Sequence, residues 1–273
     1  MQVNVVGHQI KELFEKSKQA LVVLQETNDV DQIAVATGLI ELFGSYGKKA
    51  ALLTKTTLPD ATKPLVKSEQ LKARLEPKSL VVSFDWSENQ LDKVSYFLEG
   101  NKFNLVISSR GKRLKSEDLN YSYQGTDFDL LICVGIGQIA QLKSLGLEEE
   151  VLNSTPSINL DRSPTNENFA KVNVVGEGRD SLSAVTANLL KEAGINLPTR
   201  VAEIFLYAIR VSTNNFATVT DPATFEAAAF CKRSMIPGLA PTKPSVNEEK
   251  STTQEETPEG WLSPKVFRSG KFS

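Results

Sequence analysis

Histidine and cysteine are scarce in this sequence. Its 273 residues include one histidine, His8, and two cysteines, Cys133 and Cys231. A single imidazole excludes a mechanism that needs several, and a chain without a Cys-x-x-Cys pair is a poor prospect for a zinc site. Both cysteines lie in apolar runs, so we expect buried, reduced thiols, which fit a cytoplasmic protein.

Long apolar runs and an excess of one charge are also lacking. The longest apolar run, around residues 130–140, is about half as long as a membrane span. Residues 1–15 mix charges into a helical pattern and lack the apolar centre of a signal peptide. With 31 basic and 33 acidic side chains the net charge is −2, so no overall field attracts nucleic acid or a membrane. We expect a cytoplasmic protein without a membrane partner.

Alternating strand and helix patterns predict an α/β fold. Ala20–Leu24 is a short β-branched run, Asn28 or Asp29 can cap a helix over 30–43, and Lys49–Thr54 is the next strand. This strand–helix–strand unit is the building block of a parallel sheet. Further strands are expected at 130–134, 157–160 and 171–175, and helices at 5–18, 138–145, 147–152, 181–193, 199–212 and 223–233. The prediction is a doubly wound, mainly parallel sheet spanning residues 1–236.

Two segments depart from this pattern. Strands at 80–84, 94–98 and 103–107 are joined by short turns, which predicts a small antiparallel insertion at about 80–125; before it, residues 59–77 form a connection with a short helix at 69–75. From Pro237 the chain is rich in Pro, Thr, Lys and Glu, so residues 237–273 are expected to be disordered. The tail ends in apolar residues expected to dock on a partner protein or on this protein itself: Trp261, Leu262, Val266 and Phe267.

Two carboxylates follow the first predicted strand. Asp29 and Asp31 stand at its carboxyl end, which is where open α/β sheets bind ligands. Each could offer an oxygen to a hard divalent cation. The same spacing at a helix start is also ordinary capping.

The order of these segments resembles the DHH phosphoesterase family, which includes RecJ-type exonucleases and the nanoRNA and pAp phosphatases. The family's first motif, His-x-x-Pro-Asp-x-Asp, is similar to the run Gln25–Asp31. Its second motif, an Asp at a strand end, falls on Gly135. The name-giving Asp-His-His with Pro-x-Asn resembles Asp161–Asn166, followed by Phe169, and the fourth motif, Asp-Thr-Gly-x-Phe, resembles Ser212–Phe216. The resemblance covers roughly residues 10–235.

The resemblance fails where the family's chemistry lies. Family enzymes hold two Mn²⁺-type ions with histidine and aspartate, and the positions that correspond here are Gln25, Asp29, Asp31, Gly135, Arg162 and Ser212, with Ser163 in place of the second His of the triplet. Asp161 is retained but is not expected to be a primary ligand. Gly135 cannot bridge two metals, and Arg162 puts a permanent cation among the remaining carboxylates. We therefore expect a vestigial site in which Arg162 pairs with Asp29 or Asp31 and replaces the metals.

The resemblance therefore implies a catalytically degenerate protein with a binding, scaffolding or regulatory role. No cofactor is expected, and no counterpart of the family's second domain, with its Gly-Gly-Gly-His motif, is present in the sequence. The alternative is a residual phosphoesterase acting on short oligonucleotides or nucleoside phosphates with Mn²⁺ or Mg²⁺ at Asp29 and Asp31. Asp85, at the end of another strand, could replace the lost bridging carboxylate in that case.

Two further patterns are open to a second interpretation. The run Gly135–Ala140 has the Gly-x-Gly-x-x-Ala form of a dinucleotide-binding turn, with Asp161 as a ribose-binding acid. The basic turn Arg110–Lys115 could contact phosphate or RNA, or could be a solvated loop. Arg162 and Ser163 could also hold a phosphorylated ligand if the neighbouring aspartates are paired.

Overall fold

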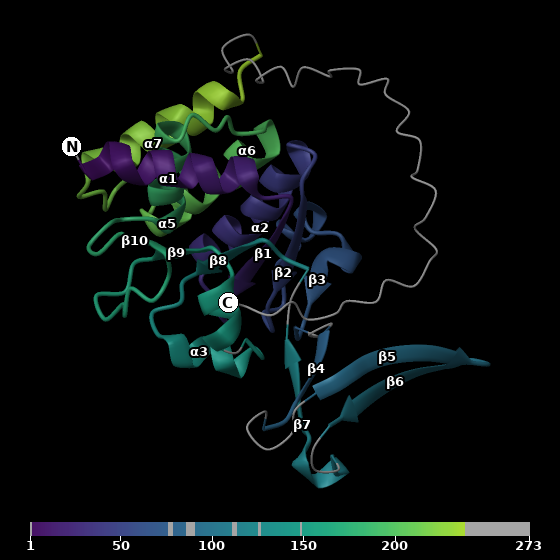
Figure 1. Cartoon of the computed structure of the whole chain (residues 1–273). Coiled ribbons are helices and arrows are strands. Elements are labelled where there is room, and N and C mark those ends of the chain that lie inside the picture. The colour runs from purple at the N-terminus through teal and green to yellow at the C-terminus, as the bar shows by residue number, and fades with distance from the viewer. Residues whose placement is uncertain are drawn as a thin grey trace. The chain divides into compact units, whose positions relative to one another are not determined.

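The protein is built around a six-stranded sheet in which every pair of neighbours is parallel (Figure 1). The computed structural model describes residues 2–75, 79–85, 91–110, 114–124, 127–147 and 149–237. The strand order is β10-β9-β8-β1-β2-β3. The strands are β1 (Gln19–Leu24), β2 (Lys49–Leu53), β3 (Leu71–Lys72), β8 (Leu130–Val134), β9 (Ser157–Asp161) and β10 (Val172–Val175).

The order reverses beside β1. From β1 the chain proceeds outward through β2 and β3, and it then returns to the other side of β1 for β8, β9 and β10. In register, Leu24 of β1 lies beside Val134 of β8, and Val134 lies beside Leu160 of β9. Ligands of open α/β sheets bind at such a switch point, beyond the carboxyl ends of the strands.

Helices cover both faces of the sheet. Successive strand residues point to opposite faces, so these apolar strands present an apolar surface on each side that helices must bury. Val22 and Leu24 belong to a large core with α1 (Gln2–Lys16), α2 (Val30–Ser45), α5 (Leu182–Glu192), α6 (Thr199–Ser212) and α7 (Pro222–Ser234). Leu21 and Val23 belong to a second core, with residues of α3 (Ile139–Ser144) and α4 (Glu149–Ser154). The predicted doubly wound sheet is therefore confirmed.

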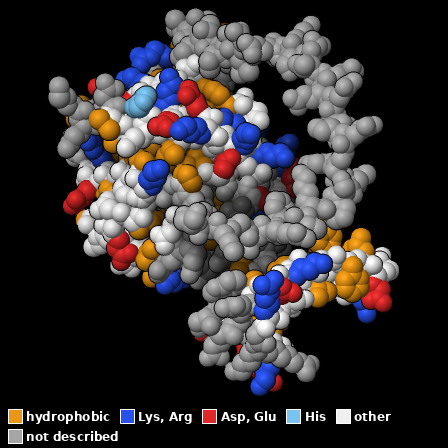
Figure 2. Space-filling model, in the orientation of Figure 1, with side chains coloured by type: hydrophobic (Ala, Val, Ile, Leu, Met, Phe, Trp, Pro, Cys, Tyr) orange, Lys and Arg blue, Asp and Glu red, His pale blue; other side chains and the backbone are white. Residues whose placement is uncertain are grey.

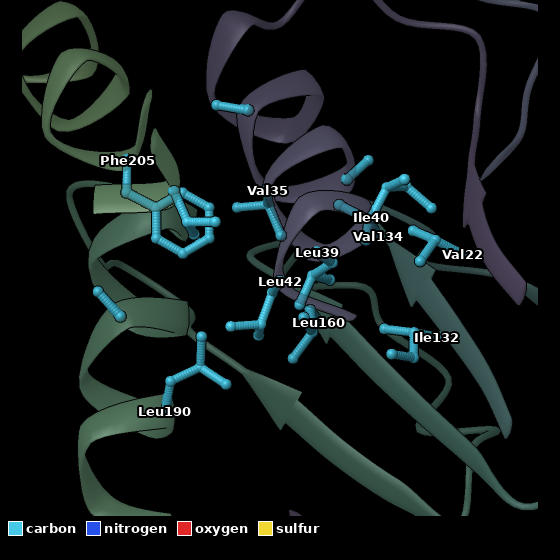
Figure 3. Close-up of a cluster of buried hydrophobic side chains, with 14 of the residues drawn as sticks. Val22, Val35, Leu39, Ile40, Leu42, Ile132, Val134, Leu160, Leu190 and Phe205 are labelled. Carbon is cyan, nitrogen blue, oxygen red and sulfur yellow. The ribbon is translucent and has the colours of Figure 1, made fainter. Parts of the chain in front are cut away.

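In the larger core, α2 packs closely against α6. Figure 3 shows Val35, Leu39 and Leu42 of α2 between the strand side chains and the ring of Phe205 on α6. Gly38 lets the two helices approach this closely, since a Cβ at that position would press into the Phe205 ring. Val22, Val134 and Phe205 are all fully buried, so this contact excludes water from the centre of the domain.

Two small antiparallel sheets interrupt the parallel pattern. β4 (Ser79–Ser83) pairs with β7 (Asn120–Gln124), and β5 (Leu91–Glu99) pairs with β6 (Lys102–Ser109). The antiparallel insertion is thus present, with β7 as a strand that the sequence patterns missed. A short 3₁₀ turn, Ser116–Asp118, precedes β7.

The predicted helix at 69–75 is wrong. Residues Lys63–Leu65 and Ser68–Gln70 form single 3₁₀ turns, and Leu71 and Lys72 pair with β2 as the edge strand β3. Leu75 is buried in the second core and Leu71 is exposed, so tertiary contacts rather than a helical stripe decide this segment. The other helices and strands agree with their expected positions to within a few residues.

The predicted docking residues Trp261, Leu262, Val266 and Phe267 lie outside the described residues. By its internal contacts the chain divides into Met1–Pro241 and Thr242–Ser273. The boundary at 236/237 and the docking role of the tail stay predictions. Among the helices that the structure describes, none is long and apolar enough to cross a membrane.

Candidate functional site

A polar cleft opens beyond the carboxyl ends of β8 and β9, beside the switch point. Its volume is about 610 Å³. The residues that line it come from the loops after β8 and β9, from α2 and α3, and from the loop before α5: Gln32, Gly135, Gly137, Gln138, Gln141, Asp161, Arg162, Ser163, Thr165 and Arg179. Four of the predicted site residues, Gly135, Asp161, Arg162 and Ser163, are thus brought into one cleft.

Asp29 caps the helix that follows β1. Its Oδ1 accepts a hydrogen bond from the backbone N–H of Asp31 at 2.9 Å, and its own N–H donates to Thr27 Oγ1 at 3.0 Å. Its other oxygen, Oδ2, accepts from Arg162 Nη2 at 3.2 Å. Both carboxylate oxygens therefore already have partners within the protein.

Asp31 holds the start of a second helix. Its side chain is fully buried, and its Oδ1 accepts from Ser181 Oγ at 3.0 Å and from the N–H of Ser183 at 2.9 Å. Its Oδ2 accepts from the N–H of Leu182 at 2.6 Å. A helix N-terminus leaves such N–H groups without intrahelical partners and carries partial positive charge, so it suits a buried carboxylate. Asp31 thus joins α2 to the start of α5.

Arg162 connects the same two helix starts. Its Nη2 lies 3.2 Å from Asp29 Oδ2 and 3.7 Å from Asp31 Oδ2, and its Nη1 donates to the carbonyl of Asp180 at 3.1 Å. The side chain is 28% exposed. The ion pair expected from the sequence is present, and it brings Arg162 together with residues about 130 positions away.

The charges in this cluster balance without a metal ion. Asp29 and Asp31 supply two negative charges and Arg162 supplies one positive charge. The N-termini of α2 and α5, which Asp29 and Asp31 cap, each contribute about half a positive charge, so the sum is about zero. Divalent ions would have to displace hydrogen bonds that these carboxylates already accept.

Gly135, which the resemblance aligned with a motif aspartate, is covered by Gln32. Its φ is +66°, and a Cβ built on it would collide with the Gln32 side-chain amide. Elsewhere in the site, Gln25 Oε1 accepts a hydrogen bond from Gln141 Nε2 at 2.6 Å. Amide groups therefore stand where the resemblance would place an aspartate and a histidine. Gln32 and Gln141 were missed by the sequence patterns because neither occupies a motif position.

In the run Gly135–Ala140, which has the form of a dinucleotide-binding turn, three backbone N–H groups already donate to side chains of the protein. The N–H groups of Gly137 and Gln138 donate to Gln141 Oε1 at 3.0 and 2.9 Å. The next N–H, of Ile139, donates to Glu167 Oε2 at 2.9 Å. A pyrophosphate would need these same donors and would meet the Glu167 carboxylate, so the geometry does not favour the dinucleotide interpretation.

Asp161 is held in place by Asn166. Asn166 Nδ2 donates to Asp161 Oδ2 at 2.6 Å and to the Ile136 carbonyl at 3.2 Å. Asp161 is 4% exposed, and Ser163 Oγ lies 3.0 Å from Thr165 Oγ1. Asn166 thus fixes the loop after β9 against the loop after β8.

Ser212 and Asp85 are not among the described residues that line the cleft. Ser212 is the last residue of α6, and its side chain is half-buried. Asp85 is exposed and follows β4, a strand of a separate antiparallel sheet.

Only Arg110, Leu114 and Lys115 of the basic turn are described, and Arg110 is paired with Asp92 at 2.6 Å.

Asp180 is a second anchoring carboxylate that the sequence patterns missed. Its oxygens accept from the N–H and hydroxyl of Thr220 at 3.0 and 2.7 Å, and from the N–H of Asp221 and the hydroxyl of Thr224 at 3.0 and 2.8 Å. Burial raises the pKa of Asp180, but these hydrogen bonds outweigh it and lower the pKa from 3.8 to about 2. Asp180 therefore ties the start of α7 to the loop on which Arg162 rests.

A two-metal site does not fit these residues. Among the described residues, no group of three or more His, Cys, Asp or Glu side chains is placed to hold a metal ion. Asp29 and Asp31 are engaged by helix N-termini and Arg162, and Gly135 offers no ligand. These carboxylates serve capping and ion pairing instead.

No protein-family model and no curated protein sequence matches this chain. Its fold, however, is similar to the crystal structure of an exopolyphosphatase-related protein from Bacteroides fragilis, at 12% sequence identity and a TM-score of 0.57. The alignment covers 85% of this chain and 57% of that chain, so this chain spans little more than half of that protein's length. The comparison therefore shows that the two proteins share a doubly wound α/β fold.

Proposed function

We propose that this chain is a cytoplasmic, catalytically degenerate relative of the DHH phosphoesterases that binds a ligand or partner instead of hydrolysing a substrate. The fold shared with an exopolyphosphatase-related protein and the order of the family-like motifs support the relationship. The cluster around Arg162 supports the loss of hydrolysis. We regard the Arg162 ion pair as the replacement for the metals.

The single observation that carries the proposal is the environment of Asp31. Its carboxylate is fully buried, accepts three hydrogen bonds at the start of α5, and lies 3.7 Å from the Arg162 guanidinium. A metal would have to replace these donors and approach a permanent cation, whose charge cannot be removed by deprotonation. The Asp31 carboxylate therefore has all its partners without a metal, and its surroundings disfavour the binding of a divalent ion.

The cleft favours a phosphorylated small molecule as the ligand. Its volume of about 610 Å³ lies within the usual range for small-molecule sites. Its lining combines two guanidinium groups with the hydroxyls of Ser163 and Thr165 and three side-chain amides, all of which can donate to phosphate oxygens. The lining also includes the Asp161 carboxylate, whose Oδ2 already accepts a hydrogen bond from Asn166. Asp29 and Asp31 are paired, so they repel such a ligand less than free carboxylates would.

Hydrolysis is tested with purified full-length protein, a dinucleotide or pAp as substrate, and Mn²⁺. We expect no Mn²⁺-dependent product and no heat of Mn²⁺ binding in calorimetry. Asp29→Ala is the control that separates residual activity from a contaminant. Turnover that disappears in Asp29→Ala would establish the residual phosphoesterase instead and refute the proposal.

Ligand binding is tested separately, without a metal. We expect AMP or pAp at millimolar concentration to raise the melting temperature of the wild type. Arg179→Ala, which removes a guanidinium from the cleft wall, should reduce that rise. Arg200→Ala is a matched control, because Arg200 pairs with Glu41 and is not among the described residues that line the cleft. Absence of any shift with either nucleotide would refute the phosphorylated-ligand part of the proposal.

A further inference from the structure

The hairpin formed by β5 and β6 carries an apolar face. Directly opposed residues share a face of an antiparallel pair, and faces alternate along each strand. The register pairs Val94 with Ile107, Tyr96 with Leu105, and Leu98 with Phe103. These three pairs form one face, which we call the apolar hairpin face: Val94, Tyr96, Leu98, Phe103, Leu105 and Ile107.

The opposite face is mixed. It presents the pairs Ser95 with Val106, Phe97 with Asn104, and Glu99 with Lys102. Charged side chains thus lie on this face and at the hairpin ends, and none lies among the six residues of the apolar hairpin face. Figure 2 shows orange hydrophobic side chains gathered on the hairpin next to basic ones.

Five of the six residues of the apolar hairpin face are more than half exposed to solvent, and Ile107 is half-buried. Val94 is 55% exposed, Tyr96 69%, Leu98 73%, Phe103 64% and Leu105 52%. Tyr96 and Phe103 stack on each other at a ring distance of 5.3 Å, which makes a flat aromatic centre. At these exposed fractions the face leaves roughly 600 Å² of apolar surface in water, since a large apolar or aromatic residue carries about 150–250 Å².

The hairpin does not take part in either hydrophobic core of the described chain. Among the described residues, β5 and β6 pair only with each other, and none of their residues belongs to either core cluster. A lone two-stranded hairpin is at best marginally stable in water, whereas a covered hydrophobic face stabilises it. Burying roughly 600 Å² at about 25 cal/mol per Å² is a large driving force for that cover.

A second copy of this chain fits the face best. Two such faces related by a twofold axis match in length and width, and neither brings a charge against the other. Together they bury about 1,200 Å², which reaches the size of a specific interface. The aromatic pair at the centre would supply the anchors that dominate such contacts.

We propose that this protein forms a homodimer in which the apolar hairpin faces of two copies pack against each other as a small β-sandwich. The proposal does not depend on the function of the cleft. It assigns the insertion a role, namely dimerisation, that the parallel sheet does not require.

The first test is the mass in solution, by sedimentation velocity of the full chain from 1 to 100 µM. We expect a species of twice 29.9 kDa at the upper concentrations. Tyr96→Lys should raise the dimer dissociation constant at least about 30-fold, because it places like charges at the interface centre. Ser95→Lys is the matched control on the opposite face and should dimerise as the wild type does. A wild type that stays monomeric at 100 µM, or equal effects of the two lysine variants, would overturn the proposal.

The second test uses cross-linking and does not need the interface to be disrupted. Leu105→Cys lies near the hairpin middle on the apolar face, and Val106→Cys is its neighbour on the opposite face. The native Cys133 and Cys231 are buried, and burial raises the pKa of both thiols, so a short bis-maleimide reacts with the new cysteine. Covalent dimer from Leu105→Cys and little from Val106→Cys is expected; the reverse ratio contradicts the packing.

A third test asks whether the chain's own tail, and not the hairpin of a second copy, forms the dimer interface. A full-length variant with Trp261→Ser and Phe267→Ser should dimerise like the wild type. If these substitutions abolish the dimer and Tyr96→Lys does not, the tail forms the interface and the hairpin does not.

Discussion

Replacing Arg162 with alanine probes the cluster that joins the starts of α2 and α5. The substitution removes the hydrogen bond to Asp29 at 3.2 Å, the contact with Asp31 at 3.7 Å and the hydrogen bond to the Asp180 carbonyl at 3.1 Å. It leaves two carboxylates with only helix N-termini to balance them. A hydrogen bond to a charged group contributes about 1.5–3 kcal/mol, and breaking a fully buried ion pair costs about 3–5 kcal/mol.

The expected loss lies below the fully buried case, because Arg162 is 28% exposed and Asp29 is 35% exposed. We therefore expect the free energy of unfolding to fall by about 2–3 kcal/mol in Arg162→Ala. For a domain of this size that corresponds to a fall in melting temperature of about 5–10 °C. Arg162→Lys keeps the charge and loses the forked geometry, so an intermediate loss of about 1 kcal/mol is expected.

The assay is urea denaturation followed by circular dichroism at pH 7, with the midpoint and the slope fitted separately. Arg179→Ala is the matched control: Arg179 also lines the cleft and pairs with a helix-capping aspartate, Asp221, but its side chain is 49% exposed. Such a pair contributes at most about 1 kcal/mol. Equal losses for the two alanine variants, or a loss below about 0.5 kcal/mol for Arg162→Ala, would refute the structural role given to Arg162.

Three further predictions concern the same region. Asp31→Asn should lower the free energy of unfolding measured by urea denaturation by about 2–4 kcal/mol, because the neutral amide cannot accept all three hydrogen bonds of the buried carboxylate. A variant as stable as the wild type would contradict this. Gly135→Asp should lower the melting temperature and restore no Mn²⁺-dependent hydrolysis, since φ is +66° and the new side chain would collide with Gln32; a stable, active variant would refute it. The pKa of Asp180 is lowered to about 2, so its contribution to the free energy of unfolding should be present above about pH 4 and be lost as the pH falls towards 2. Asp180→Asn should flatten that part of the curve of stability against pH, and an unchanged curve would contradict the prediction.

Local sequence patterns were sufficient to predict the doubly wound fold and the helix cap at Asp29, which is one part of the site. The apolar run of β1 and the helix capped by Asp29 predicted the first βα unit, and the capping bond from the Asp31 N–H is present. These features are local, because strand runs and caps involve residues that are at most a few positions apart. That Gly135 and Arg162 stand where metal ligands would be expected came only from the resemblance to the DHH phosphoesterases.

Tertiary structure alone decided what the remaining carboxylates do. Asp31 meets Ser181 across 150 residues and Asp29 meets Arg162 across 133, so these contacts depend on the order of β1, β8 and β9 in the sheet. The cover of Gly135 by Gln32 and the exposure of the apolar hairpin face are likewise invisible to any local pattern. A sequence lists the side chains that can pair, but only the packing of distant segments determines which of them lie within hydrogen-bonding distance.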